Sequence, residues 1–95
     1  RANFSIGVFA HTLLANCEQA AQLVENVTGG EASKAATYED LWKFTMVNYN
    51  AGPGCLGDAL DVASSDQEGL TWENVASHLL PTCPGAVNYV NQLSR

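Results

Sequence analysis

Two histidines and one pair of aspartates are the side chains of this sequence that could perform acid–base chemistry. Serine-type hydrolysis needs a histidine oriented by a carboxylate, but His11 and His78 fall inside helical patterns and no G-x-S-x-G turn occurs. Asp58 and Asp61 share one face of a predicted helix, and a carboxylate pair can act as acid and base at a glycosidic bond. That face carries no apolar side chains that would raise the pKa of either carboxylate. We therefore interpret all four side chains as ordinary helix residues.

A calcium loop is suggested by the segment "SDQEG", in which acids precede a glycine. An EF-hand loop has glycine at its sixth position and a bidentate glutamate at its twelfth. Aligning Gly69 with the sixth position puts Val75 at the twelfth, which excludes such a loop. Glu18, Glu25 and Glu39 each lie off the apolar stripe of their helices and belong to solvated faces. We predict no catalytic residue, no metal site and no cofactor.

The three cysteines, Cys17, Cys55 and Cys83, form no C-x-x-C pair, which argues against a zinc or thioredoxin-type site. One disulfide and one remaining thiol fit this number better. Three pairings are possible, and we favour Cys55 with Cys83 because both lie at element boundaries, where a disulfide would hold loops. Cys17 falls on the apolar face of a helix, where we expect a buried small side chain.

Acidic residues dominate the charge of the chain. Its 95 residues include ten acids and four bases, with a formal net charge of −6. The bases, Arg1, Lys34, Lys43 and Arg95, are scattered along the chain. Because phosphate binding needs clustered cations, a nucleic acid is a poor candidate partner.

The sequence predicts no membrane-spanning segment and is compatible with an exported protein. No apolar run approaches the roughly 20 residues that span a bilayer, and the N-terminus lacks the regions of a signal peptide. The start at Arg1, without an initiator methionine, favours a mature form or a fragment. Few basic residues and N-x-S/T sequons at Asn3 and Asn26 fit an extracellular or periplasmic protein.

Hydrophobic periodicity predicts an all-α chain of about five helices in a single domain. The first helix runs from Ser5 to about Glu25 and is followed by a flexible connection, "NVTGGEAS". Thr37 caps a central helix with acids in its first turn, and Thr71 caps a short one. The remaining helices span about Gly54 to Ala63 and start near Pro84. The last helix is expected to bury Val87, Tyr89 or Val90, and Leu93.

The segment "YNAGPG" predicts a corner between two helices. One helix should end at Tyr49 and Asn50, break at Gly-Pro-Gly, and give way to the next helix. Such a corner can simply be a tight connection between helices. Alternatively, its side chains and exposed backbone groups can face a cleft.

The segment "LWKFTMVNYNAGPGCLGDAL" resembles the A-Y-N-A-G-P-G motif of the soluble lytic transglycosylases, whose lysozyme-like domain is similar to goose-type lysozyme. Two further segments resemble the same domain. "TWENVASHLL…CPGAVNYVNQL" is similar to the part that ends in a helix with a Tyr-Val pair, here Tyr89 and Val90. "NFSIGVFAHTLL" is similar to the helix that follows the catalytic half. The resemblance spans nearly the whole chain.

This resemblance implies a helical domain with a groove for a peptidoglycan strand. In the family, one glutamate protonates the leaving oxygen and then acts as base, which yields an anhydro sugar. Carried over by position, Tyr49 points toward the sugar and the catalytic carboxylate. Asn50, Ala51 and Gly52 shape the corner beside it, and Tyr89 lines the same groove.

The chain departs from the family because it has neither the catalytic Glu-Ser pair nor the Gly-Leu-Met-Gln segment. Met46 also stands where the family has a small residue. The domain therefore looks incomplete on its N-terminal side, or else it has lost the acid and kept the scaffold.

Three functions follow from these departures. The first is a non-catalytic exported subunit that self-associates or binds a partner chain. The spare Cys17 supports it, as do Trp42 and Trp72 in an apolar-rich small domain that would leave a face uncovered. The alternatives are the C-terminal part of a peptidoglycan-cleaving enzyme and a glycan-binding module.

Overall fold

The computed structural model describes residues 2–67 and 69–94, with side chains from residue 10 onward. Within these ranges the chain forms six helices and no strand, which confirms the predicted all-α class. The helices are α1 (Ala2–Thr28), α2 (Ala32–Ala35), α3 (Tyr38–Ala51), α4 (Pro53–Ser65), α5 (Trp72–Leu79) and α6 (Pro84–Leu93).

The predicted helix starts are confirmed by their capping geometry. Thr37 and Asp40 form a capping box at the start of α3, in which the Thr37 hydroxyl accepts from the Asp40 backbone N–H at 3.1 Å. Thr71 caps α5 in the same way by accepting from the Asn74 backbone N–H. Pro84 occupies the first position of α6, where its missing N–H and fixed φ suit the helix.

The connection after α1 differs from the prediction. Helix α1 continues past Glu25 to Thr28, whose hydroxyl donates to the Val24 carbonyl at 2.9 Å. After two glycines the chain forms the short helix α2, where a flexible segment was expected. The Glu25 carboxylate accepts from the backbone N–H of Ala32 at 3.3 Å and so ties α2 to α1. The connection is therefore partly ordered.

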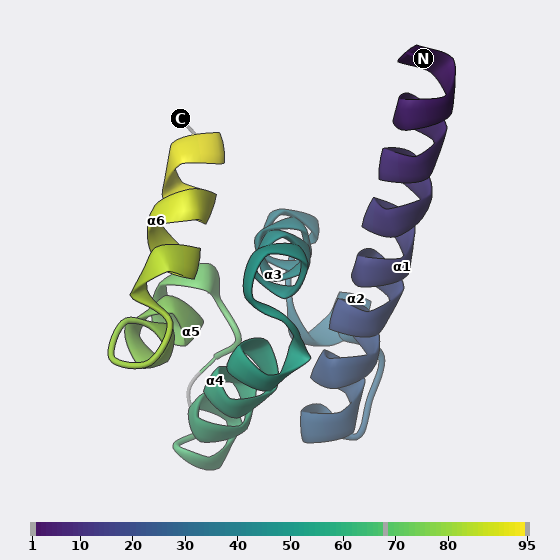
Figure 1. Ribbon diagram of the computed structural model, residues 1–95. Helices are drawn as coiled ribbons and strands as arrows, with labels where there is room; N and C mark the ends of the chain where they lie inside the picture. Colours follow the sequence, from purple (N-terminus) through teal and green to yellow (C-terminus); the bar gives the residue numbers. More distant parts are fainter. Residues whose placement is uncertain (1, 68, 95) are drawn as a thin grey trace.

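Helix α3 lies between α1 and α6 in the view of Figure 1, with α5 below α6 and α4 below α3, beside the lower half of α1. The fully buried side chains come from five of the helices, so the chain has one common core. The largest of them are Phe44, Leu56, Leu60, Leu79, Val24, Val47, Val75 and Val90.

The first half of α1 extends beyond the rest of the molecule (Figure 1). Ala20 and Val24 are the fully buried apolar side chains of this helix among those described. From Ala10 to Ala15 the side chains are exposed, apart from the half-buried Leu13. The body therefore holds the second half of α1, and little covers the helix between Ala10 and Ala15.

Polar contacts fix α1 and α5 against α3. The buried amide of Asn48 donates to the side-chain oxygens of Asn16 and Gln19 in α1, both at 2.9 Å. The Asn48 Oδ1 has no hydrogen-bond partner in the part of the chain that the structure describes. The Asp40 carboxylate also accepts from the Trp72 backbone N–H at 3.0 Å and so caps a second helix. These contacts set the relative positions of three helices.

The last helix packs on α3 and α5 through only part of its predicted apolar face. Val87 and Val90 are buried as expected, but the prediction for Leu93 is wrong because its side chain is 53% exposed. Trp72 is 5% exposed and donates its indole N–H to the Asn91 side chain at 3.4 Å. Trp72 therefore belongs to the hydrophobic core.

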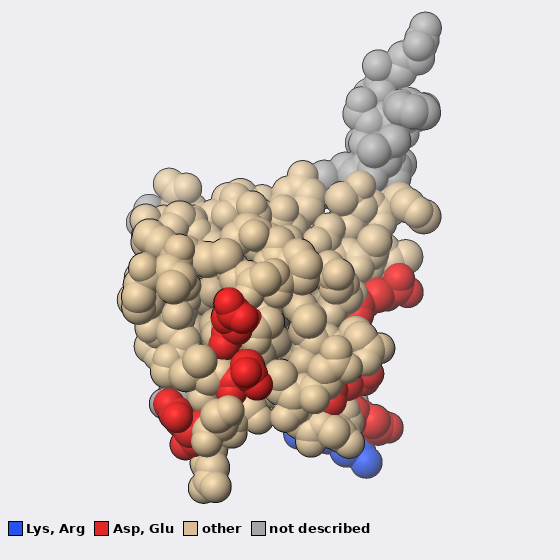
Figure 2. Space-filling view, turned by 60° about the horizontal axis from the view of Figure 1, so that its bottom comes forward, with Lys and Arg blue, Asp and Glu red and all other residues tan. Residues whose placement is uncertain are grey.

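Charged side chains are unevenly distributed. In Figure 2 the acidic side chains lie over the middle, lower and right-hand parts of the surface, and the upper part of this view shows none. Among the described residues, no helix is long and apolar enough to cross a membrane.

Candidate functional site

The predicted corner forms at Gly52. Helix α3 ends at Ala51, Gly52 is shared as the cap of both helices, and Pro53 is the first residue of α4. Gly52 has φ +91° and ψ 169°, and its N–H donates to the Asn48 carbonyl at 2.9 Å. Only glycine adopts this conformation without strain. The glycines and the proline of "YNAGPG" therefore end one helix and start the next, with Gly52 alone between them.

Replacing Gly52 tests how much the corner depends on this conformation. A Cβ at Gly52 would have no atom within 4 Å, so the cost of Gly52→Ala comes from the positive φ alone. We expect a loss of about 1–3 kcal/mol in the free energy of unfolding, measured by urea denaturation. The matched control is Gly54→Ala, which meets equally open space without a positive φ. An equal loss in both variants would contradict this explanation.

The residues expected to line a glycan groove differ in their surroundings. Tyr49 is 41% exposed, and Asn50 and Ala51 are exposed beside it at the end of α3. Tyr89 is half-buried and packs against the hydrophobic core from α6. The structure thus presents Tyr49 at the corner and places Tyr89 on a helix that also packs against α3.

The predicted disulfide joins Cys55 to Cys83, with an S–S distance of 2.00 Å. Cys55 lies in the first turn of α4, directly after the corner, and Cys83 precedes α6. The bond therefore connects the corner covalently to the helix that carries Tyr89.

An open hollow of about 340 Å³ lies between α1 and α3. It is lined by Cys17, Tyr38, Leu41 and Trp42. Cys17 is a free thiol that is half-buried at this hollow, so it is less enclosed than predicted. Tyr38 is 75% exposed and packs edge-on against Trp42, with ring centroids 6.1 Å apart. This hollow is almost entirely apolar and carries an exposed aromatic ring at its rim.

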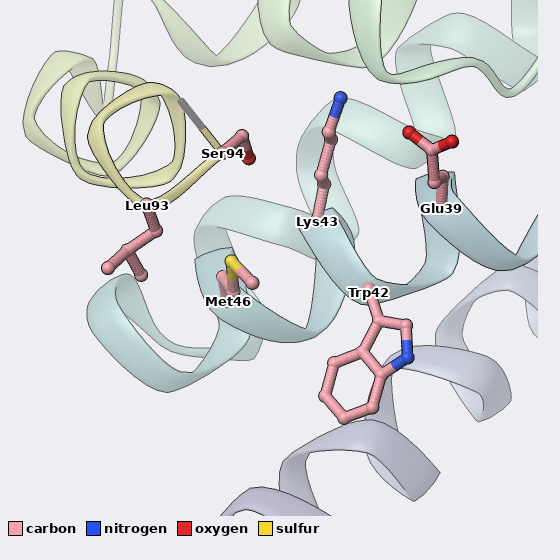
Figure 3. Close-up of a pocket in the computed structure, with 6 residues that line it drawn as sticks. All are labelled: Glu39, Trp42, Lys43, Met46, Leu93 and Ser94. Atoms are coloured by element: carbon pink, nitrogen blue, oxygen red, sulfur yellow. The ribbon is translucent and has the colours of Figure 1, made fainter.

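A second hollow of about 240 Å³ lies between α3 and the end of α6 (Figure 3). Trp42 borders this hollow too, and Met46 and Leu93 supply apolar side chains from the two helices. In Figure 3 Glu39 and Lys43 point to one side of α3, whereas the Trp42 ring points to the other side, toward α1. The polar side chains therefore lie at one edge of this surface.

Trp42 borders both hollows, so we group the apolar residues that line them as one surface on α3. We call this surface the Trp42 face and define it by Cys17, Tyr38, Leu41, Trp42, Met46 and Leu93. Large exposed apolar patches on soluble proteins commonly mark interaction sites. The arrangement is suited to packing against another apolar surface.

The carboxylates that the structure describes do not assemble into a reactive cluster. Asp58, Asp61 and Glu18 are exposed, as predicted for solvated helix faces. The Glu25 carboxylate is engaged with the α2 backbone, and Glu39 lies at the edge of the Trp42 face. Within the described residues, no group of three histidines, cysteines or acids could hold a metal ion.

Sequence reasoning missed two features of this region. The first is Tyr38, whose position four residues before Trp42 on one helix could have revealed the aromatic pair. The second is the hydrogen bonding of Asn48 to α1. Asn48 lies on the stripe of α3 that is otherwise mostly apolar, so hydrophobic periodicity does not reveal a polar contact there.

Comparisons of the chain with protein-family models, with curated proteins and with solved structures find no match.

Proposed function

We propose that this chain is a non-catalytic helical scaffold, similar to the lysozyme-like domain of lytic transglycosylases, that self-associates outside the cytoplasm. The observation that carries the proposal is the Trp42 face, where two hollows meet at one tryptophan with Tyr38 and Leu93 exposed beside it. Burying such a surface is favourable by about 25 cal/mol per Å² of apolar area. A second copy of the chain supplies an equally apolar surface.

Three further observations support parts of this proposal. The resemblance at "YNAGPG" suggests the lysozyme-like origin, and the sequence lacks the Glu-Ser pair that acts in that family. The described carboxylates lie on solvated faces or are engaged with backbone. The disulfide favours an oxidising compartment, because such bonds form and persist mainly in exported proteins.

The corner favours glycan binding as a second function. The exposed ring of Tyr49 stands beside the corner that, in the family it resembles, closes one wall of a sugar-binding groove. Aromatic rings bind sugars through their apolar faces, and the disulfide holds the neighbouring helix in place. A peptidoglycan strand is the ligand this function implies, with the chain acting either as a binding module or as part of a cleaving enzyme.

Two measurements on the wild-type chain separate these functions. We expect sedimentation velocity to show an average mass that rises from 10.1 kDa toward twice that value as concentration increases. We also expect purified cell walls to remain turbid in the presence of the chain. A stable monomer at every concentration would overturn self-association, and clearing of the walls would restore the enzymatic function. Cosedimentation with intact walls, lost in Tyr49→Ala, would establish the glycan-binding function.

A further inference from the structure

Two kinds of contact hold α1 to the rest of the molecule. From Ala20 onward the helix buries Ala20 and Val24 completely, and its Val27 carbonyl accepts from the Ser64 hydroxyl of α4 at 3.1 Å. In residues 10–19 no side chain is buried to the same degree. Local openings of a protein occur where few apolar side chains are buried. Residues 10–19 are therefore the part of this segment of α1 that separates most readily from the body.

The side chain of Asn48 joins residues 10–19 to α3. Its Nδ2 lies 3.3 Å from the Asn16 carbonyl and 2.9 Å from the side-chain oxygens of Asn16 and Gln19. An amide nitrogen carries two hydrogens, so three acceptors share two donors. The Asn16 amide cannot reverse its orientation without losing the hydrogen bond from its own Nδ2 to the Thr12 carbonyl at 2.9 Å. Asn16 therefore presents an acceptor to Asn48 and fixes which end of the Asn48 amide faces α1.

The other end of the same amide is buried at a cost. Asn48 is 3% exposed, and its Oδ1 has no hydrogen-bond partner among the residues that the structure describes. A buried acceptor without a donor destabilises the state that buries it. When residues 10–19 separate from α3, water can reach this oxygen and the acceptors of α1. Opening therefore recovers part of the free energy that is lost with the hydrogen bonds.

We propose that the hydrogen bonds of Asn48 to Asn16 and Gln19 form a latch that controls the hollow between α1 and α3. Cys17 is the α1 residue among those that line this hollow. When the latch opens, residues 10–19 leave α3 and the hollow loses its α1 side, while the buried part of α1 stays in place. For its function this inference rests on the proposed self-association, because only the closed state presents the complete Trp42 face to a second copy.

Hydrogen exchange tests the latch at protein concentrations where sedimentation shows a monomer. The variant is Asn48→Ala, which lies on α3 and leaves the helix propensity of α1 unchanged. We expect the backbone amides of residues 10–19 to exchange about fivefold faster or more in this variant. The amides of residues 20–28 should exchange at nearly the wild-type rate, because Ala20 and Val24 remain buried.

Thr45→Val is the matched control. Thr45 is also buried on α3, but its hydroxyl donates within the same helix, to the Leu41 carbonyl at 2.8 Å. This variant should leave the exchange of residues 10–19 unchanged. Gln19→Met is a second test that does not alter the core, because Gln19 is exposed. It removes one acceptor of the latch at nearly equal helix propensity and should accelerate exchange about twofold or more.

Unchanged exchange in both Asn48→Ala and Gln19→Met would overturn the latch, and so would an equal acceleration across residues 10–28. Sedimentation equilibrium then tests its control of the Trp42 face. If wild type associates, Asn48→Ala should associate about threefold more weakly or more, and Thr45→Val should match wild type. Equal association of Asn48→Ala and wild type would contradict that control. A wild type that is monomeric at every concentration would overturn self-association alone, because the exchange rates decide the latch independently.

Discussion

We expect the double variant Cys55→Ser/Cys83→Ser to lose about 3.5 kcal/mol in the free energy of unfolding. The disulfide closes a loop with a sequence separation of 28 residues, and loop-closure entropy for that length amounts to about 3.5 kcal/mol at 25 °C. A domain of this size has a total stability of roughly 5–14 kcal/mol. Removing the disulfide therefore costs a large share of the total stability. We expect the double variant to melt at a temperature about 15–25 °C lower than wild type.

This loss should appear in thermal unfolding followed by circular dichroism. The helices should still form, because Val87 and Val90 of α6 remain buried and the Trp72 indole still donates to Asn91. Cys17→Ser is the matched control, since it removes a cysteine and keeps the disulfide. A double variant that melts within a few degrees of this control would show that packing alone holds α6 at the corner.

We expect Trp42→Ala to weaken self-association by about 30-fold or more. Trp42 borders both hollows, so its truncation removes the largest side chain of the face and the one that the two hollows share. Central tryptophans of interfaces commonly contribute about 2 kcal/mol or more when truncated to alanine, and about 2 kcal/mol corresponds to about 30-fold in the dissociation constant.

Sedimentation equilibrium over a range of concentrations measures this change. Val62→Ala on α4 is the matched control, because Val62 is 44% exposed and lies outside both hollows. Its dissociation constant should equal that of wild type. An unchanged dissociation constant for Trp42→Ala, in a variant with normal helical content, would exclude this face as the interface.

The sequence predicted those features that depend on local chemistry. Thr37 and Thr71 cap their helices as expected because their hydroxyls satisfy backbone N–H groups within the same turn. The corner at Gly52 follows from the conformational freedom of glycine and the fixed φ of proline. The pairing of Cys55 with Cys83 followed from their positions at element boundaries and is confirmed.

Features that depend on packing between helices could not be predicted in the same way. Trp42 and Trp72 both lie in amphipathic helices, yet Trp72 is buried against α6 and Trp42 borders two open hollows. Leu93 continues the apolar stripe of α6, but its side chain is exposed at the end of the helix. Periodicity shows which face of a helix is apolar, and it does not show whether another helix covers that face.

The missed helix α2 has a related cause. Two glycines before it indicate a flexible segment, and its four residues are too few for a periodic signal. A tertiary hydrogen bond from its backbone to Glu25 of α1 helps to hold it in place.

The reactivity of Cys17 gives the most direct test of the central claim, that the Trp42 face is covered when two copies associate. Cys17 is the free thiol of the described chain, lines the hollow beside Trp42, and is distinguished from the two cysteines in the disulfide. Its alkylation by a small reagent can be followed by mass spectrometry over a range of protein concentrations. We predict that the rate falls as sedimentation shows the mass approaching that of a dimer. A constant rate while the mass doubles would place the interface elsewhere and contradict the account.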